Sequence, residues 1–89
     1  MALILIKYGT DHPVEKLKID SANPDDSVVL IQNGIFWTID DRISSCRGKV
    51  YVIHDDLVSR GYREADCSYP VIDYARFVEL AEKNPQFIG

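Results

Sequence analysis

Polar side chains that could move protons or contact a partner follow the apolar runs of this 89-residue sequence. In chain order they are His12, Gln32, Asn33, His54 and Asp55. If the apolar runs are parallel strands, their carboxyl ends bring these side chains to one rim, where ligands of such sheets bind. Imidazole and carboxylate groups at a rim could exchange protons. We therefore take these five residues as a candidate rim for chemistry, small-molecule sensing or partner contact.

The sequence predicts neither a metal site nor a nucleotide site. Metal sites in proteins use three or four ligands, and the two histidines belong to no His-x-x-x-His or Cys-x-x-Cys pattern that would form a rigid half-site. Gly9 stands alone in the first turn, without a dinucleotide fingerprint or a P-loop lysine motif. We accordingly expect no cofactor.

The two thiols, Cys46 and Cys67, could in principle carry sulfur as nucleophiles. A nucleophilic thiol needs a lowered pKa, and only Arg47 offers a neighbouring cation in the sequence. Both cysteines precede expected strands, which puts them at the edge of the sheet opposite the rim. We expect passive loop thiols, with sulfur transfer on Cys46 or Cys67 as the alternative. Unpaired cysteines without a paired motif also fit a cytoplasmic protein better than a disulfide scaffold.

Four apolar runs are the expected strands, at residues 2–6, 28–31, 50–53 and 71–72. The second run lacks polar alternation, which is typical of a strand covered on both faces. A helix-like segment follows each run, at residues 13–22, 34–39, 55–60 and 74–83, and residues 40–48 are expected to be irregular. Gly61 suits the left-handed end of the third helix, and Asp73 caps the fourth, which stops at Asn84 and Pro85. This alternation predicts an α/β fold, a three-layer α/β/α domain over residues 1–89 with a mostly parallel four-stranded sheet.

Helical spacing predicts which side chains face the sheet. For the second helix, Ile35, Phe36 and Ile39 are expected to face the sheet, whereas in the first helix Val14, Leu17 and Lys18 only continue the helical spacing. Trp37, next to Phe36, then points to the surface as a candidate partner contact, with a partly buried tryptophan as the alternative. The apolar face of the last helix is expected to contain Tyr74, Phe77, Val78, Leu80 and Ala81.

Composition narrows the class of protein. The sequence is 46% hydrophobic and 27% charged, as in ordinary globular proteins. A net charge of -4 argues against a phosphate-binding surface over the whole molecule, so any contact with nucleic acid is expected to be indirect. Residues 1–6 are too short an apolar run for a signal-peptide core or a membrane span, and we expect no membrane contact and a cytoplasmic location.

Several motifs in a fixed order resemble the DsrH/TusB family. The resemblance covers nearly the whole chain and is strongest for the small members from thermophilic bacteria. The motifs are Leu30-Ile31-Gln32-Asn33-Gly34-Ile35, Lys49-Val50-Tyr51-Val52-Ile53, Asp56-Leu57, Arg60-Gly61-Tyr62, Val71-Ile72-Asp73-Tyr74 and Phe77-Val78-Glu79-Leu80.

The resemblance implies a DsrEFH-like fold of Rossmann-like topology and a subunit of a sulfur relay that passes persulfide sulfur toward 2-thiouridine at the tRNA wobble position, or serves related sulfur trafficking. It implies hetero-oligomers with DsrE/TusD-like and DsrF/TusC-like subunits, a homodimer where these are absent, and a persulfide carrier as a further partner. In this family group the persulfide cysteine belongs to the DsrE/TusD subunit, where it ends the third strand. Matched through Arg60-Gly61, that position here is Ile53 or His54, so the resemblance implies a subunit that is not catalytic alone.

Overall fold

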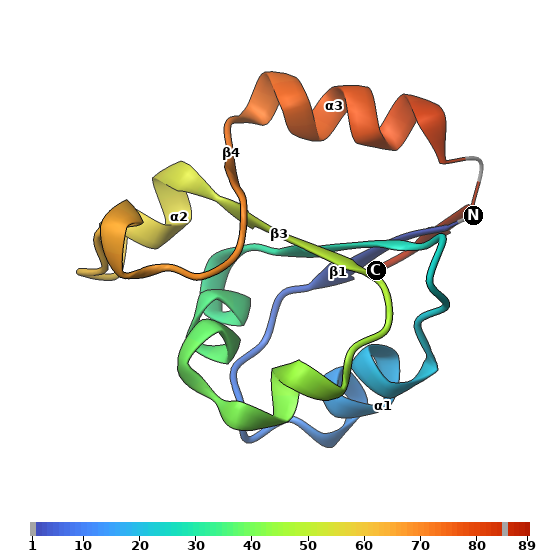
Figure 1. Ribbon diagram of the computed structural model, residues 1–89, viewed down its shortest axis with the longest axis horizontal. Coiled ribbons are helices and arrows are strands. Elements are labelled where there is room, and N and C mark those ends of the chain that lie inside the picture. Colours follow the sequence, from blue (N-terminus) through green and yellow to red (C-terminus); the bar gives the residue numbers. More distant parts are fainter. Residues whose placement is uncertain (1, 85) are drawn as a thin grey trace.

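A five-stranded parallel sheet crosses the middle of the molecule, with helices on both faces (Figure 1). The computed structural model describes residues 2–84 and 86–89. The strand order is β4-β3-β2-β1-β5. The strands are β1 (Ala2–Ile6), β2 (Ser27–Leu30), β3 (Lys49–Ile53), β4 (Val71–Ile72) and β5 (Gln86–Ile88). The predicted α/β fold with a parallel sheet is confirmed.

The helices form the outer layers and stand close to their predicted positions. One face is covered by α1 (Pro13–Ser21) and the 3₁₀ helices η1 (Gln32–Ile39) and η2 (Asp41–Ser45), and the other by α3 (Tyr74–Lys83) (Figure 1). The short helix α2 (His54–Ser59) starts directly where β3 ends, and η3 (Glu64–Asp66) precedes β4. Residues 41–45 were expected to be irregular; they form η2 because Asp40 caps it, its carboxylate accepting a hydrogen bond from the Arg42 backbone N–H at 2.9 Å.

The strand β5 is absent from the four-strand prediction. Its side chains are all exposed, so it lacks the buried apolar run that is typical of a strand covered on both faces. Pairing with β1, with Phe87 opposite Leu3, makes it a strand. The expected helix stop at Asn84 is confirmed, since Asn84 is the C-cap of α3, whereas Pro85 lies outside the described residues.

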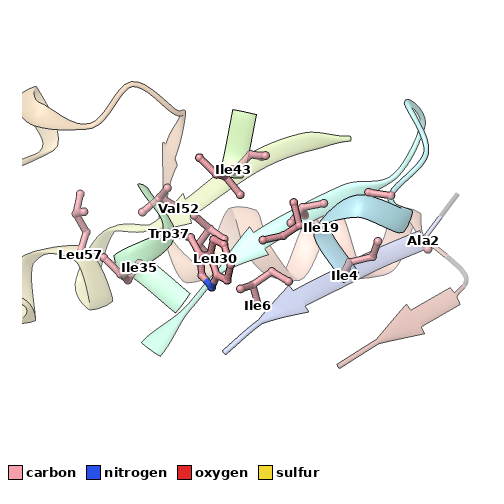
Figure 2. Packing of buried hydrophobic residues seen from close by; sticks show 13 residues of the cluster. Ala2, Ile4, Ile6, Ile19, Leu30, Ile35, Trp37, Ile43, Val52 and Leu57 are labelled. Atoms are coloured by element: carbon pink, nitrogen blue, oxygen red, sulfur yellow. The ribbon is translucent and has the colours of Figure 1, made fainter. Parts of the chain in front are cut away.

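The two faces of the sheet bury separate apolar clusters, which explains the unbroken apolar runs. On the face covered by α1, Ile4, Ile6 and Leu30 pack with Ile35 and Trp37 (Figure 2). On the opposite face, a smaller cluster packs against α3. Its buried members are Leu3, Leu5, Val29, Ile53 and Leu80.

The buried side of α1 contains a carboxylate. Val14 and Leu17 are 60% and 67% exposed, whereas Glu15 and Ile19 are fully buried. The Glu15 carboxylate accepts hydrogen bonds from the backbone N–H groups of Lys7 at 2.7 Å and Tyr8 at 3.1 Å, directly after β1. These bonds turn the helix so that its most apolar side faces away from the sheet.

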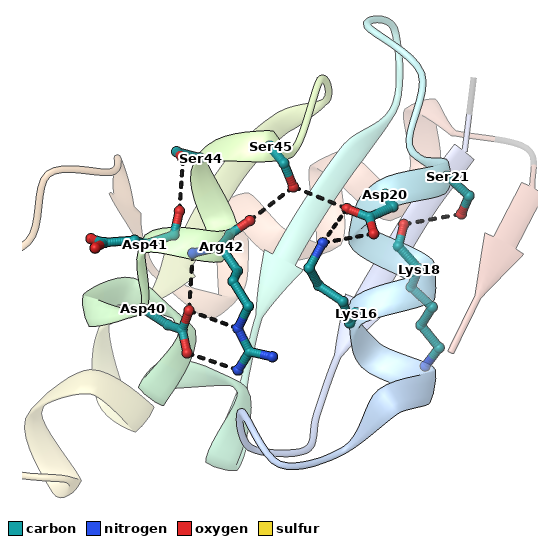
Figure 3. A network of polar contacts seen from close by, with 9 residues as sticks. All are labelled: Lys16, Lys18, Asp20, Ser21, Asp40, Asp41, Arg42, Ser44 and Ser45. Carbon is teal, nitrogen blue, oxygen red and sulfur yellow. Dashed lines mark hydrogen bonds and ion pairs between the residues drawn. The ribbon is translucent and has the colours of Figure 1, made fainter.

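Polar contacts tie α1 to η2 on the same face of the molecule (Figure 3). The Asp20 carboxylate lies 2.6 Å from Lys16 Nζ and accepts a hydrogen bond from the Ser45 hydroxyl at 2.9 Å. The Asp40 carboxylate pairs with the Arg42 guanidinium at 2.9 Å, and this pairing lowers the pKa of Asp40 to about 2. The loop after β2 is thus held against the first helix.

The predicted apolar faces of η1 and α3 also require correction. In η1, Ile35 and Trp37 are buried whereas Phe36 and Ile39 are exposed. The cause is close packing at Gly34, where a Cβ atom would lie 1.8 Å from the carbonyl oxygen of Ile6. This contact sets the rotation of η1. In α3, Leu80 is buried and Phe77 packs against its cluster, while the remaining members of the predicted face are exposed: Tyr74, Val78 and Ala81.

Candidate functional site

The carboxyl ends of β2 and β3 carry a connected set of polar groups. The Gln32 backbone N–H donates a hydrogen bond to Asp56 Oδ2 at 2.9 Å, and Arg60 Nε donates one to Asn33 Oδ1 at 3.2 Å. Arg60 Nη1 also lies 3.9 Å from Asp56 Oδ1. We call Gln32, Asn33, Asp56 and Arg60 the rim network. It joins the end of β2 to α2, as the parallel topology predicts for Gln32 and Asn33.

Asp56 and Arg60 are members of the rim that the sequence analysis missed. Their spacing of four residues places both side chains on one side of α2, which is the signal that could have identified them. Both side chains are largely buried, with 17% and 23% exposed. A partly desolvated ion pair of this kind fixes the position of the segment it contacts more firmly than an exposed pair does.

Gln32 has a left-handed backbone conformation, with φ at 51°. Residues other than glycine adopt this region at a cost of about 1–3 kcal/mol, and they do so where the surroundings hold them. Here the hydrogen bond to Asp56 and the start of η1 at Gln32 hold the backbone. The rim is thus the place in the described part of the chain where a residue other than glycine has a positive φ.

His54 and Asp55 occupy the exposed side of the same rim. His54 Nδ1 lies 3.3 Å from Asp55 Oδ1, and their side chains are 47% and 71% exposed. Tyr74, at the start of α3, faces the same charges: burial raises the pKa of its hydroxyl, and the carboxylates of Asp56 and Asp55 raise it further. The arrangement offers hydrogen-bond acceptors and an imidazole to a partner that approaches along α2.

His12 stands apart from the rim network. Its ring stacks on Tyr8 with 4.8 Å between centroids, and its Nε2 lies 3.8 Å from Asp11 Oδ1. Within residues 2–84 and 86–89, no hydrogen bond or ring contact joins His12 to His54. The two imidazoles therefore do not form a pair, although each follows a strand as predicted.

Trp37 is not available as a partner contact, because its side chain is fully buried. Its Nε1 donates a hydrogen bond to the carbonyl oxygen of Tyr8 at 3.1 Å, and the Arg42 guanidinium lies 4.9 Å from its ring centroid. The exposed member of the aromatic pair is Phe36, which contacts Tyr62 edge to face at 6.1 Å. The sequence predicted that one ring of the pair would be buried and the other exposed, but it assigned Phe36 to the sheet and Trp37 to the surface, which is the reverse of the structure.

The two thiols lie away from the rim, before β3 and β4. Cys46 is half-buried, with its Sγ 4.0 Å from the carbonyl oxygen of Gly48, and burial raises its pKa, as do the charges of Asp20 and Asp26. A raised pKa lowers the thiolate fraction, which is the reverse of what a nucleophile needs. Cys67 is also half-buried, and its Sγ lies 3.5 Å from the carbonyl oxygen of Tyr69.

The family resemblance implies that a persulfide cysteine would stand at Ile53 or His54. Ile53 ends β3 with a fully buried side chain, and the exposed residue that follows is His54. At this point β3 leads directly into α2, and neither Ile53 nor His54 carries a thiol. Among the residues described, three or more histidine, cysteine or acidic side chains nowhere gather as a metal site would require. None of the helices in the described part of the chain is long and apolar enough to cross a membrane.

Comparison with known proteins identifies relatives over the whole length. The family model described as DsrH like protein matches residues 14–87. Two NMR structures of protein Tm0979 from Thermotoga maritima superimpose with TM-scores of 0.80 and 0.75, at 54% identity and with both chains covered completely. For Tm0979 a function as sulfur transferase has been suggested. No curated protein matches the chain.

Proposed function

Because the chain belongs to the family of DsrH like proteins, we propose that it is a non-catalytic subunit of a sulfurtransferase complex. The observation that carries this proposal is the absence of a thiol where β3 leads into α2, at Ile53 and His54. The family resemblance implies that the persulfide cysteine of such a complex is supplied at this point by a DsrE/TusD-like subunit. The rim network would then position a partner, rather than carry sulfur itself.

The proposed process is tRNA wobble 2-thiolation or related sulfur trafficking in the cytoplasm, with residues 1–89 acting as one domain. The partners would be DsrE/TusD-like and DsrF/TusC-like subunits, or a second copy of the chain, together with a persulfide carrier. Physical support comes from β5, an edge strand whose Phe87 is 61% exposed, because edge strands with apolar side chains favour assembly. The net charge of -4 supports contact with tRNA through partners only.

Co-purification with the partner subunits tests the proposal. The protein, mixed with DsrE/TusD-like and DsrF/TusC-like subunits from the same source, is expected to form a complex that native mass spectrometry resolves, and deletion of its gene should lower wobble 2-thiouridine. Arg60→Ala, which opens the rim network, should weaken the complex, whereas the exposed Arg63→Ala should not. Failure to bind either subunit or a persulfide carrier, with thiolation intact in the deletion strain, would refute the assignment.

The second candidate is a sulfurtransferase that carries persulfide on Cys46 or Cys67. One observation favours it: Cys46, Cys67 and Tyr69 all pack against the same buried apolar cluster, so the two thiols lie on one side of the sheet. Mass spectrometry after incubation with a persulfide donor separates the candidates. A gain of about 32 Da on either cysteine favours this candidate, and unmodified thiols under conditions that load a DsrE-like subunit favour the first.

A third candidate is a homodimeric module that binds a small ligand at the rim. It predicts shifts of the His54 NMR signals when metabolites are added.

A further inference from the structure

A groove lies at the opposite edge of the sheet from the rim, between α3 and the amino ends of β2 and β3. Its volume is about 410 Å³, within the range of small-molecule sites. Ser27, Lys49 and Tyr51 line it from the sheet, and Arg76, Leu80 and Lys83 line it from α3. In Figure 1, α3 lies across this face of the sheet, on the side away from α1 and the 3₁₀ helices.

The lining follows from the two periodicities of the elements. Residues two apart in a strand point to the same face, so Lys49 and Tyr51 stand on the α3 side of β3, as Ser27 and Val29 do on β2. In α3, Arg76, Leu80 and Lys83 are spaced four and three residues apart and share one side of the helix. Most of the lining is thus built by regular elements, and the turn before β2 adds Pro24 and Asp25 while the end of α3 adds Asn84.

Positive charge is concentrated in the groove, although the whole chain is acidic. The chain has ten lysine and arginine residues, and three of them line the groove. The lining contains one carboxylate, that of Asp25. Arg76 pairs with Glu79 at 2.9 Å outside the lining. The ammonium groups of Lys49 and Lys83, by contrast, form no ion pair or hydrogen bond with any described residue. Two lysines that have no ion-pair partner in the described part of the chain therefore line the same groove.

Two further features define what the groove could hold. Ser27 lines the groove, and its hydroxyl forms no hydrogen bond with another residue of the described part of the chain, so it can donate to a ligand there. The Tyr51 ring and the side chain of Leu80 add an apolar wall. A ligand that uses all of these groups combines an anionic head with an apolar body.

We propose that this groove binds a small phosphomonoester with an aromatic or apolar body. A phosphomonoester carries a charge of about -1.5 to -2 at neutral pH and so matches two ammonium groups, whereas a carboxylate would leave one of them unpaired. Its oxygens accept from the lysines, the Ser27 hydroxyl and the outer guanidinium nitrogens of Arg76. The site is independent of the proposed sulfur relay, because it lies at the other ends of the strands.

Titration of the ¹⁵N-labelled protein with phenyl phosphate, followed by two-dimensional NMR, tests the site. Saturable shifts are expected at the amides of Ser27, Lys49 and Tyr51 and along α3, with tighter binding than inorganic phosphate shows. Lys49→Gln and Lys83→Gln should each weaken binding about threefold, and about tenfold together. Ser27→Ala should weaken it as well. The matched control is Lys7→Gln, which removes the same charge at the carboxyl end of β1 and should leave affinity unchanged.

Three results would overturn the proposal, and the spectra themselves show whether each variant is folded. The first is an absence of saturable shifts in the groove. The second is equal loss of affinity in Lys7→Gln and Lys83→Gln, which would indicate a general charge effect. The third is equal affinity for phenyl phosphate and inorganic phosphate, which would show that the apolar body of the ligand contributes nothing to binding. A deoxythymidine hexamer that binds here more tightly than phenyl phosphate would assign the groove to nucleic acid and refute the small-ligand proposal.

Discussion

Replacing Glu15 by glutamine should destabilise the protein in a pH-dependent way. The Glu15 carboxylate is fully buried, accepts two backbone hydrogen bonds at 2.7 and 3.1 Å, and lies 2.8 Å from Lys18 Nζ. Hydrogen bonds to a charged group contribute about 1.5–3 kcal/mol each, against about 0.5–1.5 for neutral ones, so Glu15→Gln loses about 1 kcal/mol per bond. Lys18 also loses its ion-pair partner and keeps only the carbonyl oxygen of Leu5, at 3.3 Å, so we expect a total loss of about 2–4 kcal/mol at pH 7.

The stabilisation that the Glu15 carboxylate contributes should depend on pH. Burial acts to raise the pKa of Glu15, but Lys18 and the two backbone N–H groups together lower the pKa below its ordinary value of 4.5. A lowered pKa in the folded state means that the carboxylate contributes its full stabilisation above pH 4.5 and loses it as the pH falls through the folded pKa. The difference in unfolding free energy between the wild type and Glu15→Gln should therefore be constant above that pH and shrink below it.

Urea unfolding followed by circular dichroism at pH 7, 5 and 3 measures this difference. Glu79→Gln is the matched control, because Glu79 pairs with Arg76 at the surface and should cost less than about 1 kcal/mol. In a double-mutant cycle, Lys18→Met should show coupling to Glu15→Gln. A loss below about 0.5 kcal/mol at pH 7, or a difference that grows as the pH falls, would refute the reasoning.

Three other substitutions test particular contacts. Gly34→Ala should cost about 3 kcal/mol or more in urea unfolding, because its Cβ would meet backbone atoms of Ile6 at 1.8 and 2.6 Å; a Tm equal to that of the wild type would contradict this packing. Asp56→Ala should cost about 1 kcal/mol and broaden the amide signal of Gln32, whereas an unchanged signal would mean that the carboxylate does not hold that residue. Trp37→Phe should lose about 1–2 kcal/mol with the indole hydrogen bond, and the wild-type tryptophan should resist acrylamide quenching, so strong quenching would contradict its burial.

Much of the architecture could be predicted from local patterns. The apolar runs located four strands, and Asp73 and Gly61 marked helix ends that the structure has: the Asp73 carboxylate accepts a hydrogen bond from the Arg76 N–H at 2.8 Å, and Gly61 has a φ of 84°. These features depend on a few neighbouring residues, which explains why the sequence was sufficient. The three-residue β5 has no such local pattern, since it exists through its pairing with β1.

The rim was predicted less completely than the fold. Parallel topology placed Gln32, Asn33 and His54 at one edge, but it did not indicate that Asp56 and Arg60 connect β2 to α2. Those contacts join residues 24 and 27 positions apart, so their geometry depends on how the loop after β2 turns. The family resemblance likewise indicated the position at Ile53 and His54 where a thiol is missing, which no structural detail was needed to see.

The sequence by itself determined the alternation of strands and helices, the two-sided burial of β2, and the lack of a cysteine at the end of β3. Tertiary structure alone decided which side of each helix is buried. Helical spacing favoured Phe36 and Ile39 as residues that face the sheet, yet both are exposed, as are Val14 and Leu17 of α1. The reason lies at the end of β1. The Glu15 carboxylate accepts hydrogen bonds from backbone N–H groups there, and Gly34 allows η1 to pack closely against the backbone of Ile6. These contacts outweigh the burial of a few apolar side chains.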